Sequence, residues 1–458
     1  MTATRIAVIG AGSAQFSACI VRDLCVTPSL AGSEICLMDV DAHRLALVEK
    51  LAHKIDRELG SGLRITSTTD RAAALRDAAF VINTALDGGH PWAEYQRSLA
   101  EKHGFYRGAH LSSFTNMALM LEIAQDMERL CPQAWLIQSS NPVFEGCTLM
   151  TRETGIRVVG LCHGHTGYER IAEVMGLDLK NVSAKTIGFN HWIFMTEFTY
   201  KGQDAYLLLD KWIETQAERF WAQPMPYFHD TPVSRAAMHQ YKLFGLMPIG
   251  DTPRMCDIPR VLGWWYLQDL ETRKKWYGPY GGFDSEIGWD KYLHNLEQNL
   301  RDIEQVTLDD ARRATDTFEP VRSDEQIVPL IETLVHDGEA LYHVNIPNRG
   351  PILQGIPEDV VVECDALVRG GKIVPLPQPQ LPRKVIVGAM LPRLFEAETM
   401  IEGVARGDLD LIRINLLADH RTQSLEQVDA MLEEWLADPR CARLANRLRP
   451  PRLPRLAI

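Results

Sequence analysis

The chain has 458 residues, and 48 lysines and arginines against 60 aspartates and glutamates give it a formal charge of −12. With 46% hydrophobic and 24% charged residues, it has the composition of a globular protein of two or three domain-sized units. The acidic balance argues against nucleic acid or an anionic membrane as the main partner, and no apolar stretch reaches the roughly 18 residues of a membrane-spanning helix.

The nine cysteines stand at irregular spacing without a CxxC pair. This odd, unpatterned set indicates reduced thiols rather than a disulfide framework. The stretch MTATRIAVIGAGS lacks the regions of a secretory signal, because its apolar run leads straight into a Gly-rich turn. These features predict a cytoplasmic protein.

In the first third of the chain, short apolar runs alternate with helical patterns. The predicted strands are Arg5–Ile9, Glu34–Met38, Ile65–Ser67, Phe80–Asn83 and Trp135–Gln138. The predicted helices between them are Ala14–Cys25, Asp41–Leu59, Arg71–Asp77 and Met117–Leu130. Strands alternating with helices indicate crossover units and a parallel sheet. The sequence therefore predicts a Rossmann-like, doubly wound α/β domain over residues 1–180.

The pattern after residue 180 predicts an α+β domain over residues 181–440. Asn181–Gly188 and the following NHWIFMTEFTY suggest a second, partly antiparallel sheet. Residues 233–315 are expected to be mainly helical, and the stretches Glu319–Ala340 and Met390–Leu436 are expected to be helical again. The aromatic segments Trp264–Tyr266 and Trp276–Tyr280 favour core packing over a sugar-stacking face or a subunit interface. The basic, Pro-containing tail 441–458 is expected to be disordered or to lie over a partner subunit.

A dinucleotide turn is indicated between the first strand and the first helix. Gly10 permits a tight turn, Gly12 lets the backbone approach a pyrophosphate, and Ser13 opens the helix. The third glycine of the usual pattern is absent. Asp39 ends the second strand, where a carboxylate accepts bonds from a ribose 2′-hydroxyl and repels a 2′-phosphate. This order of features predicts NAD rather than NADP.

Four further stretches combine Gly or Pro with residues suited to catalysis or binding. They are Ser140-Asn141-Pro142, Cys162-His163-Gly164-His165, Asn190-His191, and Gly250-Asp251-Thr252-Pro253-Arg254. Each alone has an ordinary interpretation: a core cysteine, a buried histidine, an Asn-Pro turn, a surface ion pair. The residues by themselves indicate an NAD-binding enzyme with possible Cys and His metal ligands.

Taken together, these stretches resemble glycoside hydrolase family 4, the NAD- and divalent-metal-dependent glycosidases. The likeness covers about residues 4–436 and includes VIGAGSAQF, ICLMDVD, SSNPVFEGCT, GLCHGH, GFNHW, GDTPR and VNIPNRGPILQGIPEDVVVE. The Cys-His-Gly triplet resembles the branch of α-glucosidases, α-glucuronidases and α-galacturonidases, which act on unphosphorylated sugars. The residue after the triplet is His165, and the resemblance does not link it to a particular substrate.

The resemblance assigns roles to individual residues. Cys162 and His191 match the metal ligands, with Mn²⁺ as the implied ion, and Asn141 matches a substrate-binding asparagine. His163 follows the metal cysteine, where family members differ by substrate type, and in the mechanism it would assist the leaving oxygen as acid. For the base that removes the C2 proton, the candidates are Asp251, which we favour, and Tyr241.

Arg254 suits bidentate recognition of a uronate carboxylate, although it would also serve to orient Asp251. An α-uronide is therefore mildly preferred over a neutral α-glucoside. The reaction that the resemblance implies is elimination: oxidation at the sugar C3 by NAD, deprotonation at C2, loss of the aglycone, addition of water and reduction at C3.

Two other functions compete with this interpretation. A lactate/malate-type dehydrogenase shares the amino-terminal architecture but needs a catalytic His–Asp pair and accumulates NADH. A non-catalytic NAD-binding protein would hold the cofactor without turnover. For the glycosidase, the expected partner is a small-molecule glycoside, with no nucleic acid or membrane, and the resemblance implies a homodimer or homotetramer.

Overall fold

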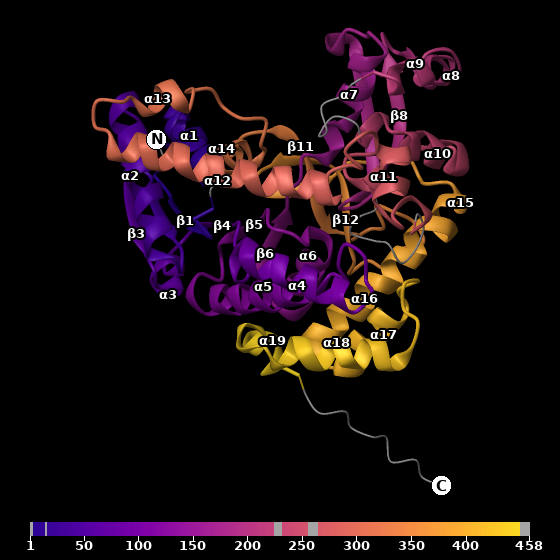
Figure 1. Cartoon of the computed structure of the whole chain (residues 1–458). Helices are drawn as coiled ribbons and strands as arrows, with labels where there is room; N and C mark the ends of the chain where they lie inside the picture. Colours follow the sequence, from indigo (N-terminus) through magenta and orange to yellow (C-terminus); the bar gives the residue numbers. More distant parts are fainter. Residues whose placement is uncertain (1–2, 14–15, 224–230, 255–263, 449–458) are drawn as a thin grey trace.

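In the computed structural model, which describes residues 3–13, 16–223, 231–254 and 264–448, thirteen strands form one mixed sheet (Figure 1). Its first part is parallel, in the order β3-β2-β1-β4-β5-β6. These strands are β1 (Arg5–Ile9), β2 (Glu34–Met38), β3 (Arg64–Thr68), β4 (Phe80–Asn83), β5 (Trp135–Gln138) and β6 (Arg157–Gly160). This is the doubly wound order of dinucleotide-binding domains, so the prediction of a Rossmann-like first domain is confirmed.

Both faces of the parallel sheet are covered by helices. In β1, Ile6 and Val8 pack with α1 (Ser17–Cys25) and α2 (Ala42–Leu59), whereas Ala7 and Ile9 pack with the helices of the opposite face. The opposite face is covered by α3 (Arg71–Leu75), α5 (Leu111–Leu130) and α6 (Val143–Glu153). A strand buried on both faces needs apolar residues in sequence rather than in alternation, which explains the continuous run RIAVI.

The strands of the second half extend this sheet in antiparallel fashion, in the order β6-β11-β12-β7-β8-β10. They are β7 (Val182–Phe189), β8 (Trp192–Tyr200), β10 (Met247–Ile249), β11 (Ala340–Pro347) and β12 (Val361–Arg369), with β9 (Gln203–Asp204) and β13 (Lys372–Pro375) at the sides. The expectation of a separate second sheet is therefore wrong. β11 joins β6 through the pair Asn345–Gly160, and β12 joins β7 through Glu363–Gly188.

The junction with β6 depends on the missing side chain of Gly160. A Cβ placed there would lie 2.6 Å from Val143 Cγ1 and 2.9 Å from Asn345 Cβ. Real Cβ atoms do not approach other atoms this closely, so β11 can lie against β6 only because this residue is a glycine.

Figure 1 shows α12 (Glu286–Leu308) crossing from the second half of the chain to α2 in the first domain. Lys54 of α2 donates hydrogen bonds to the carbonyl oxygens of Val306 and Asp309, at 2.9 and 2.7 Å. The Glu58 carboxylate accepts bonds from the backbone N–H groups of Ala314 and Thr315, at 2.8 and 2.9 Å. These bonds bind the end of α12 and the turn after it to the first domain.

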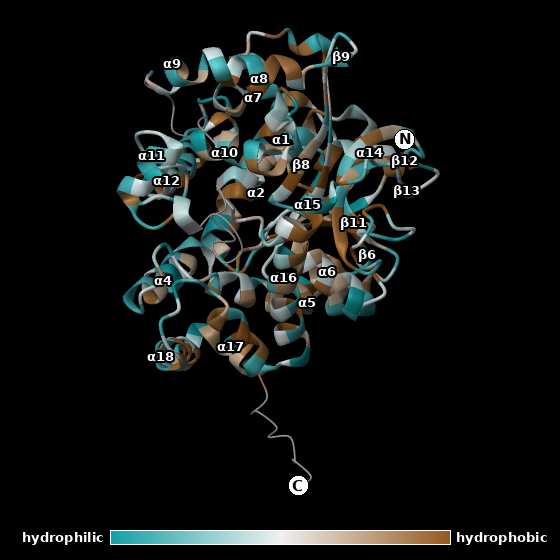
Figure 2. Cartoon of the chain, turned by 90° about the vertical axis from the view of Figure 1, so that its right-hand side faces the viewer, coloured by the Kyte–Doolittle hydropathy of each residue, from teal (hydrophilic) through white to brown (hydrophobic). Residues whose placement is uncertain are grey.

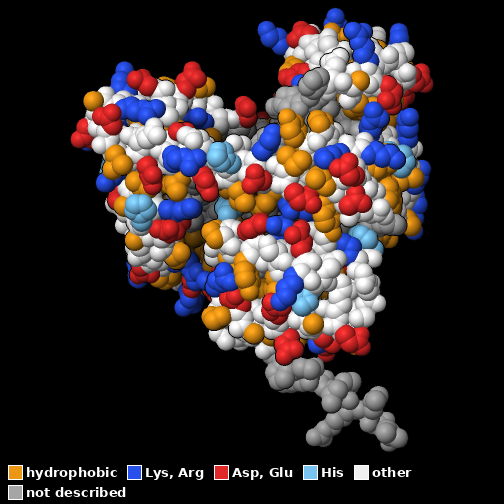
Figure 3. Space-filling view, in the orientation of Figure 1, with side chains coloured by type: hydrophobic (Ala, Val, Ile, Leu, Met, Phe, Trp, Pro, Cys, Tyr) orange, Lys and Arg blue, Asp and Glu red, His pale blue; other side chains and the backbone are white. Residues whose placement is uncertain are grey.

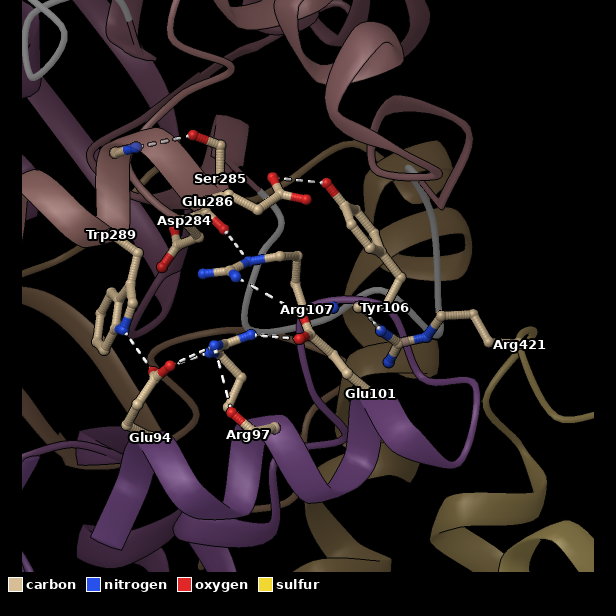
Figure 4. A network of polar contacts seen from close by, with 12 residues as sticks. Glu94, Arg97, Glu101, Tyr106, Arg107, Asp284, Ser285, Glu286, Trp289 and Arg421 are labelled. Carbon is tan, nitrogen blue, oxygen red and sulfur yellow. Dashed lines mark hydrogen bonds and ion pairs between the residues drawn. The ribbon is translucent and has the colours of Figure 1, made fainter. Parts of the chain in front are cut away.

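The beginning of α12 is held against α4 (Gly89–Lys102) by a polar network (Figure 4). The Trp289 indole donates to Glu94 Oε2 at 2.8 Å, and Arg97 pairs with the same carboxylate. Arg107 donates to the carbonyl oxygen of Asp284 at 2.7 Å. The long helix is thus bound to the first domain at both of its ends.

Two predicted helical stretches differ from the structure. Of Glu319–Ala340, only α14 (Ile327–Val335) is an α-helix, and Ala340 already begins β11. Met390–Leu436 is helical but is divided into α16 (Leu391–Arg406), α17 (Leu409–Leu417) and α18 (Leu425–Ala437). Gly407, with φ +66°, ends the first of these because the left-handed conformation cannot continue a helix.

The beginning of the expected tail is packed rather than free. Two residues here are fully buried: Cys441, which directly precedes the short helix α19 (Ala442–Ala445), and Leu444 within that helix. Apolar burial here outweighs the basic character that suggested a disordered segment. Residues 449–458 lie outside the described residues.

The aromatic segments form core, as the sequence favoured. Tyr266 and Tyr277 are fully buried, and Tyr266 meets Trp276 edge to face at 4.7 Å between ring centroids. The side chain of Trp264 lies outside the described residues.

Apolar residues concentrate in strands such as β8 and β11 (Figure 2), while acidic and basic side chains intermingle on the face shown in Figure 3. Within the described part of the chain, no helix has both the length and the apolar character needed to span a membrane.

We expect Gly160→Ala to lower the free energy of unfolding by about 1–3 kcal/mol, because the added methyl group overpacks the β6–β11 junction. Gly155→Ala is the matched control, since a Cβ there meets only Glu128 Oε1, at 3.4 Å. Denaturant unfolding measures both variants. Equal stability of the two would contradict the role given to Gly160.

A second prediction concerns Glu58. Burial opposes its charge, but hydrogen bonds from Thr315 and Ala314 hold the pKa of this carboxyl below its ordinary value. We expect Glu58→Gln to cost about 1–2 kcal/mol at pH 7. A lowered folded pKa stabilises the protein above the unfolded pKa of about 4.3, so the difference should shrink as the pH falls below that value. Denaturant unfolding at pH 7 and pH 4 measures it, with Glu49→Gln on the same helix as the control. A cost for Glu58→Gln that did not shrink at pH 4 would contradict the charged interaction.

Candidate functional site

The Gly-rich turn after β1 has the geometry of a dinucleotide site. Gly10 adopts φ +87°, and a Cβ there would lie 2.5 Å from the backbone of Ala85. The Gly12 N–H donates to Asp39 Oδ2 at 2.8 Å. The acid that follows β2 is thereby fixed beside the turn.

The start of α1 and the residue after Asp39 complete this site. Ser13 Oγ accepts a hydrogen bond from the Phe16 N–H at 3.3 Å, just before α1 begins. Val40 is 84% exposed beside the carboxylate. A carboxylate for ribose hydroxyls next to an exposed apolar side chain fits the adenosine half of NAD.

Asn141 lies in the loop that follows β5. Its carbonyl oxygen accepts a bond from Asn116 Nδ2 at 3.3 Å, and Asn116 Oδ1 accepts one from the Asp87 N–H at 2.8 Å. These bonds tie the loops after β4 and β5 together. Asn141 is exposed, which leaves its amide available to a ligand at the carboxyl edge of the sheet.

Cys162 follows β6 at the same edge and lies against the loop that contains Asp251. A Cβ built on Gly164 would be 3.8 Å from Cys162 Sγ and 3.9 Å from the Asp251 nitrogen. A Cβ built on Gly250 would be 2.6 Å from the Gly164 oxygen. Two glycines therefore allow the two loops to touch.

His191 stands in the turn between β7 and β8, with φ +59°. Its Nε2 lies 3.1 Å from Asp251 Oδ2, and both side chains are partly exposed. Asp251 is positioned by its neighbour Thr252, whose hydroxyl accepts a bond from the Ile193 N–H at 2.8 Å. The structure thus brings together the Cys162 loop, His191 and Asp251.

His163 points outward from the same loop, with its side chain 72% exposed and its Nδ1 3.4 Å from Glu325 Oε1. The Glu325 carboxylate holds the pKa of His163 above its ordinary value, and the charges of Cys162 and Asp251 add to this effect. A protonated imidazole at the edge of the site can give up a proton.

The two remaining candidates lie differently. The Tyr241 hydroxyl donates to Asp210 Oδ1 of α8 (Tyr206–Thr215) at 2.8 Å, and its ring stacks on Tyr206. Burial and the neighbouring Asp210 raise the pKa of Tyr241, so its hydroxyl stays protonated near neutral pH and cannot accept a proton as phenolate. Arg254 ends a short 3₁₀ turn after Asp251, but its side chain lies outside the described residues.

Behind these loops lies a cluster of His165, His343 and Glu363 that sequence reasoning missed. Candidate ligand atoms of the three lie within 4.8 Å of one another. Burial lowers the pKa of His165 to about 4, so its imidazole is neutral. The signal in the sequence was the acidic residues within the apolar run VVVECDA, where charged groups are unusual unless paired.

Two family models match most of the chain. The model described as "Family 4 glycosyl hydrolase" matches residues 5–177, and the one described as "Family 4 glycosyl hydrolase C-terminal domain" matches residues 186–422.

Two relatives align along nearly their whole length. An alpha-galacturonidase of Thermoanaerobacterium saccharolyticum is 24% identical over 94% of both chains. An alpha-glucosidase of Erwinia rhapontici is 26% identical over 95% of this chain and 99% of its own.

Solved structures share the fold. A 6-phospho-alpha-glucosidase from gut microorganisms, in complex with NAD and Mn²⁺, has a TM-score of 0.75 at 15% identity, over 94% of this chain and 98% of its own. Malate dehydrogenase of Plasmodium falciparum, in complex with NADH, has a TM-score of 0.50 at 14% identity, over 89% and 100%. The predicted α/β class and its dehydrogenase-like architecture are confirmed.

Proposed function

The chain belongs to the family 4 glycosyl hydrolases, and from this premise we propose that it is an NAD- and Mn²⁺-dependent α-glycosidase acting on unphosphorylated α-glycosides. The observation that carries the proposal is the meeting of the Cys162-His163-Gly164 loop with His191 and Asp251 at the carboxyl edge of the sheet. The dinucleotide turn opens at the same edge. The cofactor and the reacting sugar would therefore lie together at the carboxyl edge of the sheet.

Two relatives support the substrate class. Their names, alpha-galacturonidase and alpha-glucosidase, both denote enzymes of unphosphorylated sugars. The Cys-His-Gly triplet at residues 162–164 points the same way. Between the two glycones we favour the uronide because of Arg254, with the neutral α-glucoside as the alternative.

The residues present fit both cofactors. Asp39, held by the Gly12 N–H, suits the ribose of NAD, and its charge disfavours NADP. The half-buried Cys162 thiol and His191 would hold the divalent ion, and Asp251 Oδ2 lies 3.1 Å from His191 Nε2. A thiolate is softer than the ligands that Mn²⁺ usually takes. Independently of the metal, a thiol at this position makes the enzyme sensitive to oxidation.

When bound, NAD supplies reversible hydride transfer at the sugar C3, and the metal supplies Lewis acidity at the adjacent oxygens. Asp251 removes the C2 proton, which the C3 ketone has made acidic. His163, kept protonated by Glu325, donates a proton to the leaving oxygen. Asn141 holds sugar hydroxyls through an amide that both donates and accepts.

The choice of base gives a prediction. We expect Asp251→Asn to lower kcat by about 10²–10⁴-fold and to slow exchange of the C2 hydrogen with solvent, because the amide cannot accept a proton. Tyr241→Phe should cost less than about tenfold, since that hydroxyl is bonded to Asp210. Steady-state rates and C2 exchange by NMR measure both variants. The opposite order of effects would assign the base to Tyr241.

The reaction itself gives another prediction. Release of nitrophenol from an aryl α-glucuronide, α-galacturonide or α-glucoside should require NAD, Mn²⁺ and a thiol reductant together, without net NADH. The fastest substrate identifies the glycone. Steady NADH accumulation without nitrophenol would instead indicate a dehydrogenase, and tight NAD binding without any turnover a non-catalytic protein.

A further inference from the structure

Behind the proposed active site, His165, His343 and Glu363 converge from three segments of the chain. His165 lies on the loop after β6, His343 on β11 and Glu363 on β12. The side chains of His343 and Glu363 are 3% and 0% exposed. Two imidazoles and a carboxylate in a buried position are a donor set that proteins use for first-row transition metals.

In each of the three side chains, one polar atom is already held by a neighbour. His165 Nδ1 lies 3.1 Å from the carbonyl oxygen of Cys162, and His343 Nδ1 lies 2.8 Å from Asp365 Oδ1. Glu363 Oε2 accepts a bond from Asn190 Nδ2 at 2.8 Å. Metal-binding histidines and carboxylates are oriented by outer partners of this kind.

Of the other polar atoms, His343 Nε2 lies 3.1 Å from the Thr186 hydroxyl oxygen, a contact that a metal at Nε2 would displace. Glu363 Oε1 is buried and has no hydrogen-bond partner among the described residues. It lies 3.4 Å from His343 Nε2, a spacing that two ligands at about 2.1 Å from one ion also have. His165 completes the set within 4.8 Å, and it lies on the loop, where a small movement would bring it to bonding distance.

Charge also favours a cation here. Glu363 and Asp365 place two carboxylates around His343, and one protonated imidazole offsets only one of them. A divalent ion in place of that proton would balance both.

We propose that His165, His343 and Glu363 form a second divalent-metal site, for a borderline ion such as Zn²⁺, distinct from the Cys162–His191 site. This second site goes beyond the proposed function, because metal binding there can be measured without any turnover of substrate. The two sites share their supports: Cys162 and His165 lie on one loop, and Asn190 precedes His191. Occupancy of the buried site would fix the loops that carry the first one.

The test is the number of Zn²⁺ ions bound per chain, measured by equilibrium dialysis of the metal-free protein and elemental analysis. The wild type should bind two ions, and His343→Gln and Cys162→Ser one each. His336→Gln, the same change outside the cluster, should keep two. Asp365→Asn should weaken one of the two sites by about 10–100-fold.

Co²⁺ separates the sites by spectroscopy. A thiolate-to-cobalt absorption band reports the Cys162 site alone, so His343→Gln should keep it and Cys162→Ser should lose it. If His343→Gln fails to fold, His165→Asn at the partly exposed member replaces it, with circular dichroism as the check.

One ion per chain in the wild type, lost in Cys162→Ser and kept in His343→Gln and His165→Asn, would overturn the proposal and leave a metal-free ion-pair network. Because binding is counted without substrate or NAD, this result is independent of whether the glycosidase assay succeeds.

Discussion

The site depends on the single place where the parallel part of the sheet meets the antiparallel part. Gly160 pairs with Asn345 there, and the absence of a side chain lets β11 lie against β6. Two residues later comes Cys162. The strands β1, β4, β5 and β6 all end at this carboxyl edge, which is the edge where dinucleotides bind in sheets of this kind. The junction therefore places loops of the second half of the chain at that edge.

The charged residues buried beside this junction carry a desolvation cost that apolar residues would not carry. Glu363 is fully buried and pairs with His343, which is also bonded to Asp365. Replacing such a pair by apolar residues is often neutral or stabilising, so its presence is weak evidence for a role in stability. Its position argues for a role in placing loops, since Asn190, bonded to Glu363, immediately precedes His191.

The first domain could be predicted because its signals are local. The runs at Arg5–Ile9 and Phe80–Asn83 and the order of Gly10, Gly12 and Asp39 each lie within one crossover unit. The cluster of His165, His343 and Glu363 could not be predicted, because the bonds that hold it join distant residues. Asn190 and Glu363, for example, are 173 positions apart. No periodicity reports such pairs. The sequence favoured Asp251 over Tyr241 as the base by resemblance alone, and the bond between Tyr241 and Asp210 joins residues too far apart in the chain for a local pattern to report.

The supports shared by the two proposed metal centres would constrain how either can move. A shift of the Cys162 loop displaces both the thiol and, through the carbonyl of Cys162, the His165 ring. A shift of the turn at Asn190 displaces both His191 and the hydrogen bond to Glu363. His343 and Glu363 are buried on the paired strands β11 and β12, so the cluster would be the more rigid of the two proposed centres. We infer that the geometry of the proposed Cys162–His191 centre is set by the buried groups that support its loops rather than by the residues that would contact a substrate.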